Sequence, residues 1–442
     1  MQGAKDLTNG PIGQQLFRLA LPIMASSFIQ MAYSLTDMAW VGRIGSEASA
    51  AVGAVGILVW TTNALSLLGK VGAEVSVGQS IGASDWKAAR SFASHNLTLS
   101  FGVALLWGTL LFVLAGPIMN LFGMEASITT ASVSYLSIVS TAFPFIFFSV
   151  ASMGIYNAAG RSTIPFWING SGLLLNIVLD PVFIFVFGWG TDGAAWATWL
   201  SQAIVCLFFI WNLKYRNRLF EGFPLFVRLR KMETLRIFRL GFPVALFNAL
   251  FSFVSLFLSR EAARYGGHLG VMALTTGGQI EAVTWTTSQG LSTALSAFIS
   301  QNYAARKMNR VLKAWKTTLW MSGLVGGVIT IFFVGLGPEI FSLFVPEKTA
   351  YEAGGVYLRI SGYSQLFMML EITTQGVFYG TGRTIPPAVT SIVLNYARIP
   401  LAWFLCQYMG VEGIWWAVTL SSIAKGCVLA GWFSLKRKHM WG

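Results

Sequence analysis

Long apolar runs constrain this sequence more than any other feature. About twelve runs of roughly 20 residues or more follow one another, separated by short polar connections. Hydrocarbon offers no water to backbone N–H and C=O groups, so a chain crosses a bilayer only as helices or as a closed barrel. These runs are long and do not alternate, which favours helices. A composition of 55% hydrophobic and 11% charged residues also excludes a soluble protein.

The sequence therefore predicts an all-α integral membrane protein with twelve transmembrane helices. Their expected centres lie near residues 27, 60, 104, 144, 175, 203, 248, 285, 323, 366, 396 and 423.

The net charge of +13 lies mainly in every second connection. The basic residues of these connections include Lys87, Arg90, Arg161, Lys214, Arg216, Arg228, Arg230, Lys231, Arg306, Lys307, Arg310 and Arg383. An even number of spans places both termini on this side, and the positive-inside rule makes it cytoplasmic. Because the charge is dispersed over short connections rather than gathered on one face, we expect no nucleic-acid partner.

The chain repeats itself at a register of about 221 residues. "FRLALP" at Phe17 returns as "FRLGFP" at Phe238, and "NAAGRSTIP" at Asn157 returns as "YGTGRTIP" at Tyr379. Six spans in each half make the two repeats parallel, an arrangement typical of transporters. The predicted division is residues 1–213 for an N-terminal lobe, 214–234 for a cytoplasmic linker and 235–442 for a C-terminal lobe.

Two acids distinguish the first half from the second. Asp37 corresponds to about Leu258 in the repeat, and Asp180 in "LNIVLDP" corresponds to Ile399 in "LNYARIP". A scaffold role predicts similar residues in both halves, whereas acids within a membrane usually serve a function. The difference therefore indicates a titratable site in the N-terminal half, with a structural ion pair as the alternative.

Helical spacing gathers polar side chains around these two acids. Gln30, Tyr33 and Asp37 share a face of the first span, and Asn176 and Asp180 share a face of the fifth at i, i+4. Desolvation and like-charge repulsion disfavour ionisation of both carboxyl groups in one apolar pocket, as proton coupling requires. Thr198 in the sixth span is a further candidate. For Asn176 and Thr198 an ordinary interhelical hydrogen bond is the alternative.

Pro22 lies fifteen residues before Asp37, about 22 Å along a helix, and so falls inside the first span. Proline removes a backbone hydrogen bond and kinks a helix. The kink is either static or a hinge that responds to protonation of Asp37.

The substrate-contact candidates are spread over both halves. Glu281 and Glu371 lie in apolar spans of the second half, where they either attract cationic cargo or pair with Arg398. Met153 and Asn157 are predicted contacts in the first half, although helix packing explains most Met and aromatic residues equally well.

No catalytic or nucleotide-binding motif is present. The sequence contains no GxxxxGK[ST], HExxH or GxSxG pattern, and its three cysteines lie far apart in apolar segments. We therefore expect no enzyme activity, no cofactor and no resident metal, and secondary active transport remains.

Several segments resemble the multidrug and toxic compound extrusion (MATE) family, specifically its bacterial DinF-like branch. The resemblance is carried by "LALPIMASSFIQMAYSLTDMAWVGRIG", "FISQNYAARKMNR", "NAAGRSTIP" and "LLLNIVLDPVFIFVFGWGTDGAAWATWLSQ". It implies twelve helices in two six-helix lobes around a V-shaped cavity, in a monomer of the bacterial inner membrane. It also implies export of lipophilic, often cationic compounds in exchange for protons or sodium ions.

The resemblance assigns roles residue by residue. It implies a cation-coupling cluster of Asp37, Asn176, Asp180 and Thr198, cargo contacts at Gln30 and Tyr33, and a bend at Pro22. Other branches have a sodium-associated carboxylate in the seventh helix, and "PVALFNALFSFVSLF" has none. This favours protons, while sodium binding at the N-terminal cluster stays open.

Two other functions compete with this interpretation. A lipid-linked oligosaccharide flippase shares the architecture but usually needs a cationic central cavity, and only Arg398 is plainly intramembrane in the second half. A membrane-embedded enzyme or receptor is less consistent with parallel duplication.

Overall fold

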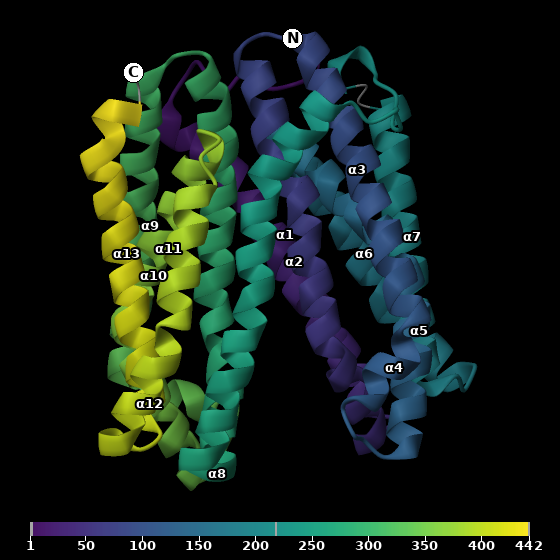
Figure 1. Ribbon diagram of the computed structural model, residues 1–442, viewed down its shortest axis with the longest axis vertical. Coiled ribbons are helices and arrows are strands. Elements are labelled where there is room, and N and C mark those ends of the chain that lie inside the picture. The colour runs from purple at the N-terminus through teal and green to yellow at the C-terminus, as the bar shows by residue number, and fades with distance from the viewer. Residues whose placement is uncertain (1–2, 217–218, 441–442) are drawn as a thin grey trace.

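The computed structural model describes residues 3–216 and 219–440 of the chain, and Figure 1 shows it as an all-helical protein. The helices of the first half are α1 (Ile12–Gly42), α2 (Ser46–Gly82), α3 (Trp86–Val113), α4 (Ala115–Asn120), α5 (Ala126–Ala158), α6 (Thr163–Pro181) and α7 (Gly190–Trp211). The helices of the second half are α8 (Lys231–Ala304), α9 (Met308–Ser342), α10 (Lys348–Gly380), α11 (Ile385–Tyr396), α12 (Arg398–Met409) and α13 (Glu412–Met440). Short helical segments η1 (Val182–Val186), η2 (Asn212–Arg216) and η3 (Leu219–Glu221) complete the described part.

The predicted membrane spans are confirmed as helices. Ten helical segments of the described chain are long and apolar enough to cross a bilayer. One of them, α8, has 74 residues and contains two crossings, while α10 has 33 residues and packs between α8, α9 and α13. Every span centre expected from the sequence falls within a helix.

The seventh and eighth spans join without a loop. Within α8 the chain reverses at Gly267, whose φ of 58° and ψ of −146° are not helical. The reversal brings Gly270 so close to Ala262 that a Cβ on Gly270 would lie 2.5 Å from the Ala262 carbonyl oxygen. Glycine permits this positive φ at little steric cost, and so a single residue forms the turn.

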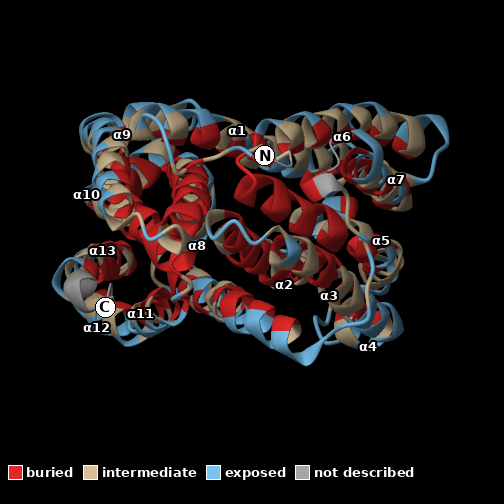
Figure 2. Cartoon of the chain, turned by 90° about the horizontal axis from the view of Figure 1, so that it is seen from above, coloured by how far each residue is buried: buried red, intermediate tan, exposed pale blue. Residues whose placement is uncertain are grey.

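The two bundles converge at the end where both termini lie and diverge toward the other end (Figure 1). Viewed from that end, buried residues line the inner faces of both bundles (Figure 2). The first helix of each half crosses to the other half. Leu16 and Leu19 of α1 pack in one apolar cluster with Leu295 and Phe298 of α8, whereas Ile237 of α8 packs with residues of α2, α3 and α5.

The N-terminal segment bridges the halves at the convergent end. Its Lys5 N–H donates to the Ala159 carbonyl, 2.8 Å away, in the first half. Its Leu7 N–H donates to Gln301 Oε1 at 3.0 Å in the second half. Arg236 of α8 adds a hydrogen bond of 2.8 Å to Gln79 of α2. These polar contacts hold this end closed.

The segment between the two halves is docked on the first half. Phe226 packs against Phe101 of α3 and Phe148 of α5, with ring centroids 5.2 and 6.0 Å apart. Next to it, the Val227 N–H donates to the Thr98 hydroxyl at 3.0 Å. The connection is therefore packed against α3 and α5.

Candidate functional site

The first element of the site is a hydrogen bond between α1 and α7. The Thr198 hydroxyl donates to Asp37 Oδ2 at 3.2 Å. Asp37 lies in the last third of α1, on the part of the helix that packs against α6 and α7 of the first half. The bond joins residues 161 positions apart, so only the fold brings them together.

The second element is the end of α6. Asn176 Nδ2 donates to Asp180 Oδ1 at 3.1 Å, as the i, i+4 spacing predicts, and both side chains are fully buried. Immediately after Asp180, Pro181 ends the α-helix and the wider π-helical segment η1 follows. Single π-turns of this kind occur frequently at functional sites.

These two elements form one cluster, because Asn176 and Asp180 both lie within interaction range of the Asp37 carboxyl group. Three acceptor oxygens of the cluster are buried without a hydrogen-bond donor: Asp37 Oδ1, Asn176 Oδ1 and Asp180 Oδ2. Buried polar atoms are normally satisfied, so unpaired acceptors on adjacent carboxyl groups require a partner. A proton or a small hard cation supplies such a partner.

Sequence reasoning missed two members of this cluster. Tyr135 of α5 is buried and lies within electrostatic range of both carboxyl groups. Ser201 of α7 is also buried, one helical turn after Thr198, and lies next to the Tyr33 hydroxyl. Tyr33 itself is close to Asp37, as its spacing on α1 predicts.

The other predicted contacts of the first half lie elsewhere. Gln30 is exposed on α1, about 10 Å along the helix from Asp37. Met153 and Asn157 follow Tyr135 on α5 by 18 and 22 residues, which places them about 27 and 33 Å away along the helix. Both are buried, and Asn157 donates to Glu74 Oε1 at 3.1 Å.

The acids of the second half occupy two different environments. Lys425 Nζ lies 3.2 Å from Glu371 Oε2, and Ser391 and Gln375 donate to Glu371 Oε1. Arg398 instead donates to Ser421 and Ser422, at 2.7 and 2.9 Å.

The alternative of a direct salt bridge between Arg398 and either Glu281 or Glu371 is thus not realised among the described residues. Glu281 remains half-buried, with its Oε1 lacking a hydrogen-bond partner.

Two tryptophans meet between the two halves. Trp60 of α2 and Trp285 of α8 have ring centroids 6.3 Å apart, and each side chain is 39% exposed. The Trp60 indole also donates to the Asn248 carbonyl at 3.2 Å across the two halves. Trp285 lies one helical turn after Glu281, so an acid and an aromatic pair share this region.

The sequence matches the family described as MatE over residues 22–182 and 243–404. The probable multidrug resistance protein NorM of Thermotoga maritima is 28% identical over 426 residues, which cover 91% of this chain and 88% of that protein.

Two solved structures share the fold. A transporter of the MOP superfamily from Pyrococcus furiosus, described as having reverse polarity of its binding pocket, aligns with a TM-score of 0.92 at 24% identity over 99% of this chain and 98% of its own. A MATE structure in a bent conformation aligns with a TM-score of 0.93 at 23% identity over 98% of this chain and 97% of its own.

Proposed function

The chain belongs to the MatE family of membrane transporters, not to an enzyme family, and from this premise we propose that it is a multidrug efflux antiporter. It exports lipophilic, often cationic compounds in exchange for entering protons. The observation that carries the proposal is the cluster of Asp37 and Asp180 with its unpaired buried oxygens.

Proton coupling follows from the chemistry of this cluster. Two carboxyl groups that share an apolar site resist ionising together, so the entry of one proton changes the charge of the pair. A protonated carboxyl group becomes a donor, and the unpaired oxygens of Asn176 and Asp180 are acceptors for it. Protonation therefore draws α1 and α6 together, whereas deprotonation leaves a negative charge that attracts a cationic cargo.

The course of α1 links this local change to the whole molecule. Leu16 and Leu19 before Pro22 and Ile23 after it pack on the second half, whereas Val41 near the end of α1 packs on the first half. Pro22 thus lies inside α1, shortly before the helix leaves the second half. A bend there moves the Asp37 segment while the first turns of α1 stay in place, and the bend expels cargo from the N-terminal half.

Cargo of this class fits the region where the bundles diverge. The exposed rings of Trp60 and Trp285 offer apolar and cation–π contacts, and Glu281 adds a negative charge nearby. The name of the Thermotoga relative, a probable multidrug resistance protein, supports drug-like cargo. Tyr33 beside Asp37 and the exposed Gln30, about 10 Å away along α1, are the proposed contacts of the first half. Met153 and Asn157 require a rearrangement to reach cargo because both are buried.

Sodium is the second candidate for the coupling ion. The three unpaired oxygens of Asp37, Asn176 and Asp180, together with the Thr198 hydroxyl, are the hard ligands that such an ion prefers. A lipid-linked oligosaccharide flippase fits less well, because Arg398 and Lys425 are buried and already engaged, and so offer little positive charge to a pyrophosphate.

The remaining assignments rest on the same premise. We propose the DinF-like branch on the resemblance of the segments quoted from the sequence, and the lack of a carboxylate from Pro243 to Phe257 supports protons as the coupling ion. We also propose a monomer in the bacterial inner membrane with both termini in the cytoplasm. The lobe boundaries at residues 213 and 235 remain a prediction.

Transport in proteoliposomes tests the proposal. Efflux of a fluorescent lipophilic cation is measured under a pH gradient without sodium, and then under a sodium gradient at equal pH, for the wild type and Asp37→Asn. We expect efflux with the pH gradient alone and its loss in the variant. Efflux driven by sodium reassigns the cluster to sodium, and full pH-driven efflux by Asp37→Asn excludes Asp37 as the coupling residue.

A further inference from the structure

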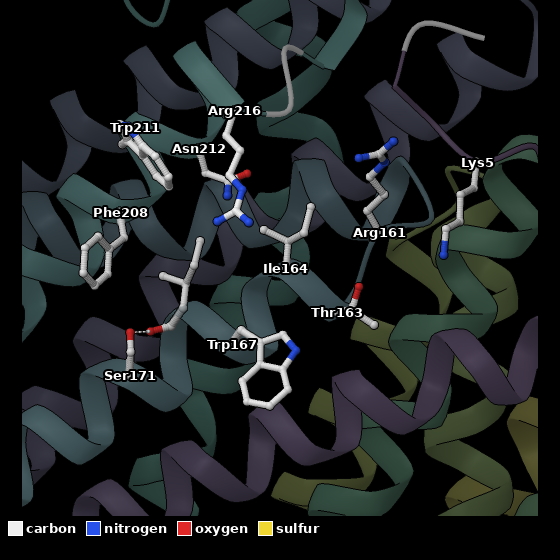
Figure 3. A pocket seen from close by; sticks show the side chains of 11 residues that line it. Lys5, Arg161, Thr163, Ile164, Trp167, Ser171, Phe208, Trp211, Asn212 and Arg216 are labelled. Carbon is white, nitrogen blue, oxygen red and sulfur yellow. Dashed lines mark hydrogen bonds between the residues drawn. The ribbon is translucent and has the colours of Figure 1, made fainter.

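A second pocket lies outside the Asp37 cluster, at the end of the first half that carries the N-terminus (Figure 3). The start of α6, the end of α7 with η2, and the N-terminal segment enclose it. Its volume of about 690 Å³ is within the range of pockets that hold small molecules. The proposed antiport assigns no role to this pocket.

The pocket is strongly basic. Lys5, Arg161 and Arg216 line it, and its described lining residues include no carboxylate. Lys5 and Arg216 are exposed, and in the described part of the chain neither forms an ion pair. Figure 3 shows Lys5 and Arg161 on one side and Arg216 on the other, with Ile164 and Trp167 between them. Three cations around one pocket favour an anionic ligand.

Exposed tryptophans place the pocket at the depth of lipid headgroups. Trp167 is 72% exposed and Trp211 is 48% exposed, although both belong to membrane-spanning helices. Tryptophan concentrates at the membrane–water interface, where its ring is apolar and its N–H reaches polar groups. The Arg216 guanidinium lies 5.6 Å from the Trp211 ring centroid. The charged group and the aromatic ring therefore lie at about the same depth in the membrane.

The second half repeats this arrangement only in part. "TIPFW" at residues 163–167 aligns with "TIPPA" at residues 384–388, so Ala388 stands in the place of Trp167. Ala388 is buried, whereas Trp167 is the most exposed of these aromatic residues. At the register of about 221 residues Lys5 corresponds to Phe226, so its charge is not repeated. Arg161 does correspond to Arg383, so the pocket differs from the second half at Lys5 and Trp167.

We propose that this pocket binds the phosphodiester headgroup of an anionic phospholipid from the leaflet at this end of the molecule. Basic pockets between transmembrane helices at the headgroup level bind such lipids through charge-assisted hydrogen bonds. The cations hold the phosphate, and the exposed faces of Trp167 and Phe208 lie against the glycerol and the first part of the acyl chains.

Native mass spectrometry of the detergent-purified full chain, titrated with phosphatidylglycerol, tests this proposal. The variant Lys5→Gln/Arg216→Gln removes two cations of the pocket, and Lys313→Gln/Lys316→Gln removes two exposed cations of α9 outside it. We expect an affinity about tenfold lower for the first variant and an unchanged affinity for the second. Unfolding temperatures without lipid establish that both variants are folded.

Two further titrations identify the source of the phosphate. Phosphatidylcholine carries the same phosphodiester without net charge, and inorganic phosphate carries charge without acyl chains. The proposal requires that phosphatidylglycerol binds in preference to phosphatidylcholine and that millimolar phosphate does not displace it. Equal binding of the two lipids, displacement by phosphate, or an equal loss in the α9 variant overturns it.

Discussion

Lys425 and Glu371 form an ion pair of 3.2 Å in the interior of the second half, where both side chains are almost completely buried. Lys425 lies on α13 and Glu371 on α10, so the pair joins two helices of one bundle. Ser391 and Gln375 satisfy the second oxygen of Glu371. The pair is thus a fully bonded unit rather than a free charge.

Removal of one partner of this ion pair is therefore expected to lower the stability of the protein more than removal of both. Lys425→Met leaves a buried carboxylate without its counter-charge, which costs about 3–5 kcal/mol. Glu371→Gln/Lys425→Met removes both charges and should regain most of that stability. Unfolding temperatures in detergent compare the two, and a double variant less stable than Lys425→Met contradicts a structural role for the pair.

The Thr198 hydroxyl is expected to matter for coupling and not for packing. Thr198→Val keeps the shape but removes the hydrogen bond of 3.2 Å to Asp37, whereas Thr198→Ser retains it. A hydrogen bond to a charged group contributes about 1.5–3 kcal/mol, so we expect pH-driven efflux about tenfold slower for the valine variant. The serine variant should stay close to the wild type. Equal rates in both variants indicate that the bond is incidental.

Pro22→Ala tests the proposed bend in α1. Alanine restores the missing backbone hydrogen bond and is favoured by about 3 kcal/mol in a helix interior. We expect a straighter, less mobile helix and slower transport, with the fold preserved. Spin labels at Leu35 of α1 and Leu256 of α8, both exposed, report the distance between the halves. Two distances in the wild type should become one in Pro22→Ala, and an unchanged distribution places the hinge elsewhere.

The Asp6 carboxylate at the convergent end is expected to make the stability of the protein depend on pH. Partial burial raises the pKa of Asp6, but hydrogen bonds from Thr8 and Asn9 and the charge of Lys307 outweigh burial and hold the pKa below its ordinary value of 3.8. A lowered folded pKa gives stability that is present above the unfolded value and is lost as pH falls through the folded one.

Asp6→Asn should therefore lower the unfolding temperature at pH 7, by about 1 °C, and this difference should disappear as the pH falls below 3.8. Glu125→Gln, which changes an exposed acid of another connection, serves as the control and should show no such trend. A difference that does not shrink as the pH falls below 3.8 assigns the effect to the shape of the turn and not to charge.

The sequence predicted those features that depend on spacing along one helix. Apolar runs located every span, and the i, i+4 spacing of Asn176 and Asp180 correctly predicted their contact. The repeat register and the resemblance drew attention to Asp37. None of these signals shows which bundle a helix packs against, and so the crossing of α1 to the second half was not foreseen.

The missed contacts share a physical cause. Tyr135, Ser201 and Lys425 are ordinary residue types on their own helices, and they gain significance only through partners on other helices. Asn157 shows the reverse case, because its motif is conspicuous but its amide is occupied by Glu74 of α2. Spacing describes one helix at a time, whereas these pairings depend on the packing of several.

The docking of Phe226 limits how the two halves move. Because this ring is held between α3 and α5, the chain up to Val227 travels with the first bundle. The start of α8 is held on the same bundle, because Ile237 packs with residues of α2, α3 and α5. The chain from Phe226 to Ile237 is therefore docked rather than slack, and it permits the halves to change their angle about the convergent end but not to separate widely.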